Sequence, residues 1–167
     1  MENDIATEIR MRLIEVGGKT SQDLGMGRIL GQILMYLYLQ EGECSLDQIG
    51  EELGLSKAAV STAVRQLESL GLLRQVWRKG DRRNYYRTAD DIGTALQNGL
   101  LAFVRQKVQS VAMEIDSANV ILEKEIKTPD ASTDIHFIHN RVKRAKYLRD
   151  MAANLLDSPL LGFLKKV

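Results

Sequence analysis

Apolar positions recur at spacings of three and four residues over most of the chain, which is the period of an amphipathic helix. This spacing predicts long helices over residues 3–16, 24–40, 92–126 and 131–156. We expect Gly17 and Gly18 to stop the first of them. Gly27 and Gly31 lie one turn apart and favour a close crossing of two helices, the alternative being close approach to a ligand.

Two shorter helices in the middle of the chain carry cap signals at both ends. Ser45 and Gln48 have the spacing of a capping box, with Cys44 in the flanking apolar position, and predict a helix over 46–53. Gly54 suits a left-handed end, and Ser56 then caps a second helix that runs to residue 70. Two capped helices joined by three residues predict a helix-turn-helix.

The second of these helices has two faces of different character. Val60, Ala63, Val64 and Leu67 fall on one side and are expected in the core. The opposite side is small and polar with a single long cation, and comprises Ala58, Thr62, Arg65 and Ser69, flanked by Lys57, Ser61 and Gln66. Such a face lets a helix lie close in a DNA major groove and present donors to base edges.

A β-hairpin follows this helix. Residues 72–78 and 85–88 have β-favouring composition, and between them 79–84 form a turn rich in Gly, Asp and Asn with three cations. We interpret the segment as a wing attached to the helix-turn-helix. Cations at the tip of such a hairpin suit contact with phosphates or entry into a minor groove.

Charge is unevenly distributed along the chain although its formal net value is only +1. Residues 1–55 carry four basic and ten acidic side chains, whereas 56–87 carry eight basic and two acidic ones. A dense basic block in an otherwise acidic chain favours a polyphosphate partner, the alternative being a solvated charged face. Because the block coincides with the predicted helix-turn-helix and wing, it favours nucleic acid.

These segments resemble the winged helices of the MarR family, and more closely its GbsR-type branch. The resemblance lies in the sequence strings at 27–31, 53–61, 67–73 and 76–86. It implies a dimeric DNA-binding repressor or activator, often with a small-molecule pocket between the winged helix and the dimerisation helices. Ser56 to Gln66 match the family's recognition helix, and Asp81 to Arg83 match its wing tip.

The residue pattern and the resemblance together predict which residues contact double-stranded DNA. On the helix these are Ser56, Lys57, Ala58, Ser61, Thr62, Arg65 and Gln66, and on the wing Lys79, Arg82, Arg83, Asn84 and Tyr85. Arg65 has the chemistry to bond guanine and Gln66 to read adenine.

The segment 92–126 carries a heptad seam over three repeats, formed by Leu101, Val104, Val108, Val111, Ile115, Ala118 and Leu122. A helix of this length spans about 50 Å, whereas a compact 167-residue domain is about 40 Å across. We therefore predict that a second copy packs along the seam and forms a homodimer. The alternative, compatible in a bundle, is pairing with the last helix, whose apolar positions are Ile135, Ile138, Val142, Ala145, Leu148, Ala152 and Leu155.

Four further features have structural interpretations that we prefer to functional ones. Tyr36, Tyr38 and Trp77 suit the core more than an effector pocket, and His136 and His139 lack the second ligand cluster of a metal site. The last helix also carries a basic patch at Arg141, Lys143, Arg144, Lys146 and Arg149, which we interpret as a solvated face rather than a contact to flanking phosphates. Cys44 is expected to be an apolar side chain rather than a redox sensor.

Several classes of function are disfavoured. The chain has no Gly-rich phosphate loop and no nucleophile elbow, so we do not expect an enzyme, a cofactor or a metal. Its longest apolar run is seven residues, against roughly 20 for a membrane span. With one cysteine and an acidic start lacking a signal-peptide pattern, we expect a cytoplasmic protein with no membrane partner.

The sequence thus predicts a mostly α-helical protein with a small β-hairpin wing: a winged helix-turn-helix over residues 1–90 and a helical dimerisation region over 91–167. We expect a sequence-specific transcriptional regulator, a repressor, that acts as a homodimer on a pseudo-palindromic operator under the control of an effector of unknown identity. The alternative is a winged-helix adaptor that binds protein. That alternative predicts an apolar or acidic recognition face and a neutral wing, whereas Lys57, Arg65, Arg82 and Arg83 are basic.

Overall fold

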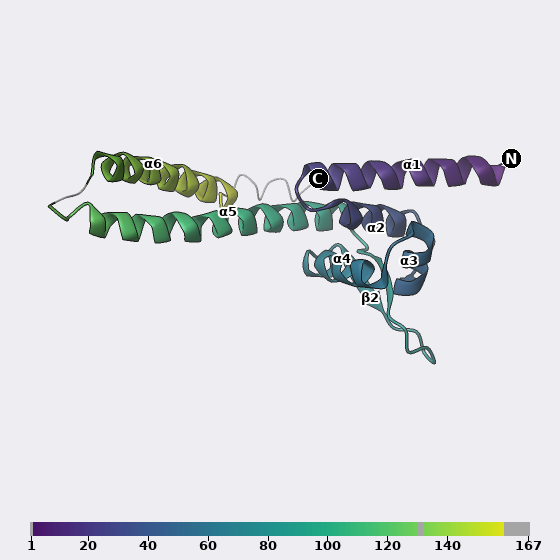
Figure 1. The fold of residues 1–167 in the computed structure, drawn as a ribbon. Coiled ribbons are helices and arrows are strands. Elements are labelled where there is room, and N and C mark those ends of the chain that lie inside the picture. The colour runs from purple at the N-terminus through teal and green to yellow at the C-terminus, as the bar shows by residue number, and fades with distance from the viewer. Residues whose placement is uncertain (1, 130–131, 159–167) are drawn as a thin grey trace. The chain divides into compact units, whose positions relative to one another are not determined.

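The computed structural model describes residues 2–129 and 132–158, with side chains from residue 5 onward. This part of the chain forms six helices and three short strands, and it confirms the predicted mainly helical fold with a small hairpin (Figure 1). In chain order they are α1 (Glu2–Asp23), α2 (Arg28–Tyr38), β1 (Cys44–Ser45), α3 (Leu46–Leu53), α4 (Lys57–Ser69), β2 (Leu73–Val76), β3 (Tyr85–Thr88), α5 (Ile92–Glu125) and α6 (Thr133–Leu156). They form two compact units, one ending at Gly99 and the other beginning at Leu100.

Helix α1 continues through Gly17 and Gly18, so the predicted stop at these residues is wrong. The glycines instead let α1 lie against α2: a Cβ added to Gly31 would stand 2.1 Å from the carbonyl oxygen of Gly17. Gly31 therefore permits the predicted close crossing. Gly27 takes no part in the crossing, because it precedes α2 with a φ of 97° and has open space around its Cα. Across the crossing, Arg28 Nη2 binds Glu15 Oε2 at 2.7 Å.

The helix-turn-helix forms at the predicted residues. Ser45 accepts from the Gln48 amide while the Gln48 side chain accepts from the Ser45 amide, which completes the capping box at the start of α3. Gly54 ends α3 with a φ of 63°, and Ser56 caps α4 by accepting from the Ala59 amide. The apolar side of α4 lies in the core as predicted, with Val60, Ala63, Val64 and Leu67 all buried. Each fully buried aliphatic side chain of this kind contributes about 1.5–3 kcal/mol to folding.

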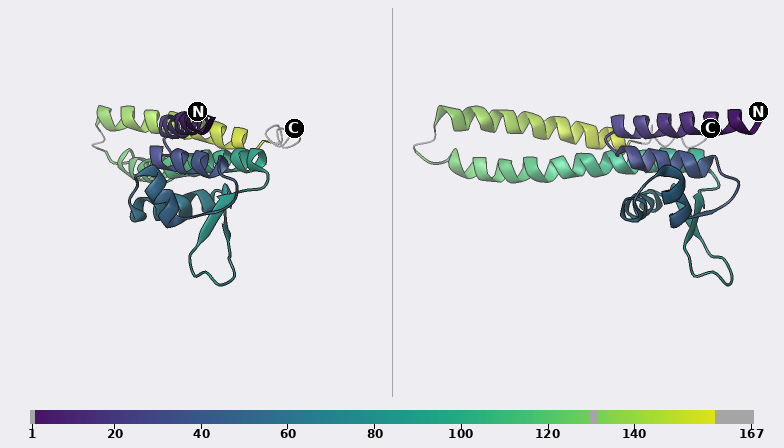
Figure 2. Two further views of the ribbon diagram at one scale, coloured as in Figure 1. Left: turned by 90° about the vertical axis from the view of Figure 1, so that its right-hand side faces the viewer. Right: turned by 45° about the vertical axis from the view of Figure 1, so that its right-hand side comes forward.

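The sheet has the order β1-β3-β2, with both pairs antiparallel. Strand β1 is absent from the sequence-based prediction because two residues are too few to show a period. It pairs Cys44 with Tyr86 and Ser45 with Tyr85, and so ties the base of the hairpin to the start of α3. Beyond this sheet, the loop between β2 and β3 projects away from the helices of its unit (Figures 1 and 2).

In the second unit, α5 and α6 lie side by side and antiparallel (Figures 1 and 2). Arg105 Nη2 donates to the Leu156 carbonyl at 2.8 Å, and Arg149 Nη1 donates to Asp116 Oδ2 at 2.7 Å. Six of the seven predicted seam residues are half-buried in this single chain, whereas Val111 is 54% exposed.

The side of α6 that faces α5 agrees only in part with the prediction, because Ile135, Val142, Ala145 and Ala152 are half-buried as expected. Ile138, Leu148 and Leu155, which were expected to point inward, are exposed. His139 is buried instead, and the Arg149 side chain is only 11% exposed because it lies against Asp116. A pair of helices buries one narrow stripe of each partner, so a wide apolar face on α6 leaves a second stripe uncovered.

Candidate nucleic-acid interface

The predicted contact residues of α4 lie on its solvent side. Ser56, Lys57, Ala58, Thr62, Arg65 and Gln66 are exposed, and Ser61 is half-buried. Arg65 Nε donates to the Ser61 carbonyl at 3.2 Å, which aligns the side chain along the helix surface. Arg65 has no carboxylate partner among the described residues, so its guanidinium edge is free to donate to a base or a phosphate.

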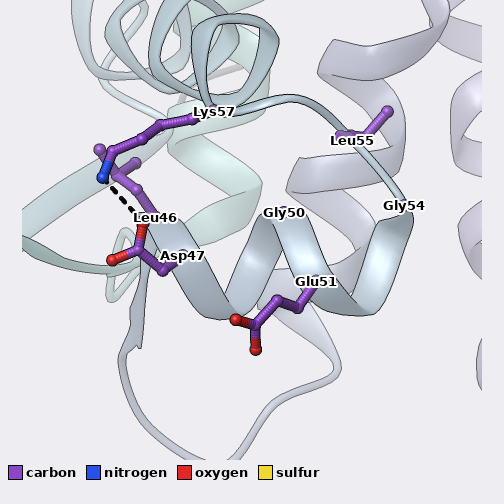
Figure 3. A pocket seen from close by; sticks show the side chains of 7 residues that line it. All are labelled: Leu46, Asp47, Gly50, Glu51, Gly54, Leu55 and Lys57. Atoms are coloured by element: carbon purple, nitrogen blue, oxygen red, sulfur yellow. Dashed lines mark ion pairs between the residues drawn. The ribbon is translucent and has the colours of Figure 1, made fainter.

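At the start of α4, Lys57 is engaged by an acidic residue of α3. Its Nζ lies 3.0 Å from Asp47 Oδ1 across the turn that joins the two helices (Figure 3). The two residues line an open pocket of about 410 Å³, together with Leu46, Gly50, Glu51, Gly54 and Leu55. Two carboxylates at its rim make this pocket unsuited to a phosphate.

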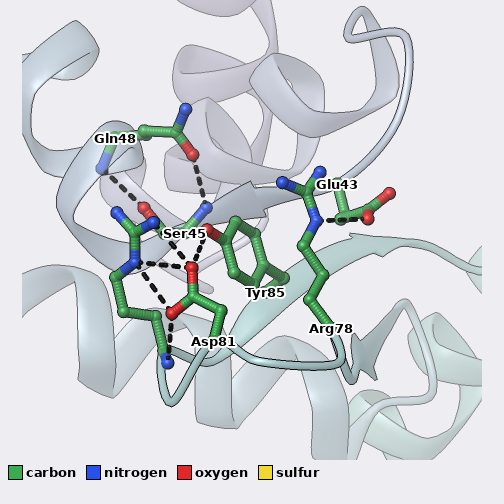
Figure 4. A network of polar contacts seen from close by, with 7 residues as sticks. Glu43, Ser45, Gln48, Arg78, Asp81 and Tyr85 are labelled. Carbon is green, nitrogen blue, oxygen red and sulfur yellow. Dashed lines mark hydrogen bonds and ion pairs between the residues drawn. The ribbon is translucent and has the colours of Figure 1, made fainter.

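The tip of the wing is organised around the Asp81 carboxylate. It accepts from the Arg83 amide at 2.9 Å, from Arg83 Nη2 at 2.7 Å and from the Tyr85 hydroxyl at 2.8 Å (Figure 4). The hydrogen bonds from Arg83 are the largest cause that holds the pKa of Asp81 far below its usual range. Asp81 therefore stays ionised and remains the acceptor of the hydrogen bonds from Arg83 and Tyr85.

A second ion pair anchors the other strand of the wing. Arg78 Nε donates to Glu43 Oε1 at 2.7 Å, and the Arg78 guanidinium lies 4.2 Å from the centre of the Tyr85 ring (Figure 4). The hydrogen bond to Arg78 is the main cause of the lowered pKa of Glu43. Tyr85 itself is 3% exposed, so this predicted contact residue supports the wing from inside rather than offering a surface to DNA.

The basic side chains of 56–87 fall into two groups once these contacts are counted. Arg74 and Arg87 both bind the Asp90 carboxylate, at 2.7 and 2.6 Å. The group that is paired with a carboxylate therefore comprises Lys57, Arg74, Arg78, Arg83 and Arg87. The group with no carboxylate partner among the described residues is Arg65, Lys79 and Arg82. Its members stand on α4 and on the loop of the wing, and all three are exposed.

Two further side chains of the hairpin have shifted pKa values. The pKa of Arg83 is raised mainly by its hydrogen bond to Asp81, and Asp47, the partner of Lys57, adds to the shift. Burial raises the pKa of Tyr86. The last predicted wing contact, Asn84, is exposed, and its Oδ1 accepts from Gln75 at 2.8 Å.

The sequence-based analysis missed the acidic residues that pair with some cations of the basic block and leave the others free. Glu43, Asp47 and Asp90 flank the basic block in the sequence, and this flanking position was the available signal.

The remaining candidates of the sequence-based analysis were not among the predicted DNA contacts. Tyr36 is buried in the core, and Tyr38 and Trp77 are exposed, so the core placement predicted for the last two is wrong. Within the described residues, no group of three or more His, Cys, Asp or Glu side chains is placed to hold a metal. The described helices also include none that is long and apolar enough to cross a bilayer.

Comparison with known proteins agrees with this geometry. Residues 24–84 match the model of the MarR family. The chain is 23% identical to the HTH-type transcriptional repressor OpcR of Bacillus subtilis (strain 168) over 92% of its own length and 85% of that protein. It is 24% identical to the HTH-type transcriptional repressor GbsR of the same organism, over 95% and 90% of the two chains.

A solved structure supports the fold along the whole chain. A crystal structure of a transcriptional regulator superimposes with a TM-score of 0.65 and 23% identity, covering 95% of this chain and 99% of the other. The relatives carry the names of transcriptional regulators rather than of enzymes. Residues 24–84 thus match the MarR family, and along most of its length the chain is similar to HTH-type transcriptional repressors that include GbsR.

Proposed function

We propose that this protein is a cytoplasmic, sequence-specific repressor that binds a pseudo-palindromic DNA operator as a homodimer. The observation that carries the proposal is the group of Arg65, Lys79 and Arg82, which lie on α4 and the wing without a carboxylate partner among the described residues. A fixed wing tip with free cations suits phosphate and minor-groove contact, while the small exposed side chains of α4 suit the major groove.

Each predicted contact residue has a role in this proposal. Arg65 and Gln66 read base edges, with the small side chains of Ala58, Ser61 and Thr62 allowing close approach. Lys79, Arg82 and Asn84 contact the backbone or the minor groove. Ser56, Lys57, Arg83 and Tyr85 hold the helix start and the wing tip in place for these contacts.

The homodimer is supported by apolar surface that one copy leaves uncovered. On α6 the exposed set is Phe137, Ile138, Tyr147, Leu148, Met151 and Leu155, and on α5 it includes Val111, Val120 and Ile121. On α6, Phe137, Leu148, Met151 and Leu155 fall on one side at helical spacing, and an exposed apolar stripe of this kind is rare on a monomer. A second copy would bring an identical stripe to each of these helices, as a two-fold interface requires.

Repression is proposed from the names of two relatives. The chain matches them over 85% and 90% of their own length, and both are named HTH-type transcriptional repressors. An effector would act by changing the separation of the two recognition helices, because half-sites are read at a fixed spacing of about 34 Å per turn.

The DNA-binding step is tested by titrating a fluorescent pool of random duplexes with the protein between about 50 and 200 mM salt. We expect the logarithm of the affinity to fall linearly with the logarithm of the salt concentration. Substituting Lys79→Gln and Arg82→Gln together should weaken binding and reduce the slope by about two, because each contact releases about one counterion. The matched control is Arg10→Gln with Lys19→Gln on α1, which should change neither.

Absence of duplex binding at low salt would contradict the proposal and favour the winged-helix adaptor. Binding that the wing substitutions leave unchanged would contradict the assigned surface.

A further inference from the structure

Trp77, the single tryptophan of the chain, is 86% exposed at the end of β2. An indole has one of the largest apolar surfaces of any side chain, and leaving it in water forgoes about 1.5–3 kcal/mol of burial. Trp77 is also not part of the hydrophobic core cluster. Its exposure on the wing therefore needs an explanation outside the folding of this chain.

Trp77 lies where the hairpin leaves its sheet. Leu73 and Tyr86 belong to the core cluster, and Gln75 lies opposite Tyr86. Strand β2 ends at Val76, so Trp77 is the first residue beyond the strand and precedes the wing loop that carries Lys79 and Arg82.

The hairpin joins the wing to the recognition unit through the core. Leu73 and Tyr86 belong to the same core cluster as the buried side chains of α4. Trp77 follows β2 directly and precedes Lys79 and Arg82, two of the three cations on which the proposed function rests. The exposed indole therefore belongs to the same wing as these cations.

The surroundings of Trp77 define the chemistry of its partner. Among the described residues, neighbouring Lys79 and nearby Arg82 have no carboxylate partner, and both are exposed. A partner that matches this loop must present negative charge and apolar surface within a few ångströms of each other. The grooves of duplex DNA do so, because phosphates alternate there with the apolar faces of deoxyribose.

We propose that Trp77 is a DNA-contact residue of the wing, whose indole packs against the deoxyriboses that line the minor groove next to the phosphates bound by Lys79 and Arg82. The inference rests on the proposed DNA-binding function and adds an apolar contact to it. The indole N–H remains available to donate to a phosphate oxygen.

An apolar contact has a different salt signature from a cationic one. Trp77 neutralises no phosphate, so its removal should lower affinity at every salt concentration by the same factor. Removal of Arg82 should instead lower the slope of the salt dependence. The two contributions are therefore separable by measurement on the same duplex.

The first test uses the fluorescence of Trp77 itself in the full-length protein. The probe is a mixed-sequence duplex of about 30 base pairs at low salt, carrying a dye that reports binding by anisotropy independently of the tryptophan. We expect saturation with duplex to change the Trp77 emission in parallel with the anisotropy, and to reduce its quenching by acrylamide at least about twofold. Emission that stays constant while anisotropy rises would overturn the assignment of Trp77 but leave DNA binding intact.

The second test compares substitutions. Trp77→Ala should weaken duplex binding about tenfold with an unchanged salt slope and an unchanged thermal midpoint, since the side chain is exposed. Trp77→Phe should restore most of the affinity, because it keeps an apolar ring. Tyr38→Ala removes another exposed aromatic side chain from α2 and should leave binding unchanged.

Failure of the inference and of the proposed function give different results. If no anisotropy change occurs, DNA binding itself fails, and the inference with it. If the Trp77 emission instead changes with protein concentration in the absence of DNA, Trp77 faces a second copy of the chain and the proposed contact is wrong.

Discussion

At the scale of single residues, carboxylates decide which cations of the basic block are free to bind DNA. Asp90 binds two arginines, and Glu43 binds Arg78 across 35 residues of sequence. The basic block was evident from the sequence, but which of its cations pair with a carboxylate was not. This pairing depends on how the sheet brings distant segments together. Arg65 and Arg82 are exposed, as DNA contacts must be, whereas Tyr85 is buried although it directly follows a charged turn.

Tyr36 provides a residue-scale prediction about stability at high pH. Burial, the largest cause, raises the pKa of this phenol well above its ordinary value near 10. The unfolded chain therefore ionises first as the pH rises past 10, and stability present below that pH is lost by up to about 1.4 kcal/mol per pH unit. Tyr36→Phe should reduce this loss, as measured by urea unfolding at pH 8 to about 11.

Tyr38→Phe is the matched control, because Tyr38 is exposed on the same helix. Equal alkaline destabilisation of the wild type and the Tyr36→Phe variant would show that Tyr36 is not buried as described. The burial of Cys44 likewise raises its thiol pKa, which agrees with its interpretation as an apolar side chain.

At the scale of elements, local signals sufficed where the chain makes its own contacts within a few residues. The caps Ser45 and Ser56 fixed α3 and α4 almost to the residue. Gly17 and Gly18 misled the prediction because the same glycines serve to stop a helix or to let another helix approach. Only the packing of α1 on α2 distinguishes these two uses, and packing is not a local property.

The crossing of α1 and α2 should be intolerant of any side chain at Gly31. Gly31→Ala would place a Cβ 2.1 Å from the Gly17 carbonyl oxygen and should destabilise the protein by at least about 2 kcal/mol, because backbone must move. Gly93→Ala is the control, since its Cβ would meet nothing closer than 3.6 Å in the first turn of α5. It should be neutral or stabilising by up to about 1 kcal/mol.

Urea unfolding of both variants measures these effects. A Gly31→Ala protein as stable as the wild type would mean that α1 does not cross α2 at this distance.

At the scale of the whole molecule, the sequence left open whether α6 or a second copy covers the seam on α5. A heptad pattern shows that a helix has an apolar stripe but not which helix covers it. In the structure six of the seven seam residues are half-buried in the single chain, as the alternative of pairing with the last helix predicts, while Val111 and much of α6 stay exposed. This exposed remainder supports the proposed dimer.

We predict that the protein sediments at twice its chain mass of 18.8 kDa. Leu148→Lys combined with Met151→Lys should yield a monomer that stays folded, because both side chains are exposed in one chain. The monomer should bind the operator at least about a hundredfold more weakly, since it loses the second half-site. Asn140→Lys, at an exposed polar position of α6, is the control and should remain dimeric.

Light scattering distinguishes these states. A wild-type monomer at micromolar concentration, or a double variant that stays dimeric, would place the interface elsewhere.

The measurement that tests the central claim most directly is selection of the purified protein on random duplex DNA near physiological salt, followed by sequencing of the bound pool. It is carried out in parallel with wild type and Arg65→Ala. The account predicts a symmetric motif with half-sites about one helical turn apart, and loss of preference at one position in each half-site for the variant. No enriched motif, or the same motif with the same preferences from Arg65→Ala, would contradict the assignment of α4 as the element that reads the DNA sequence.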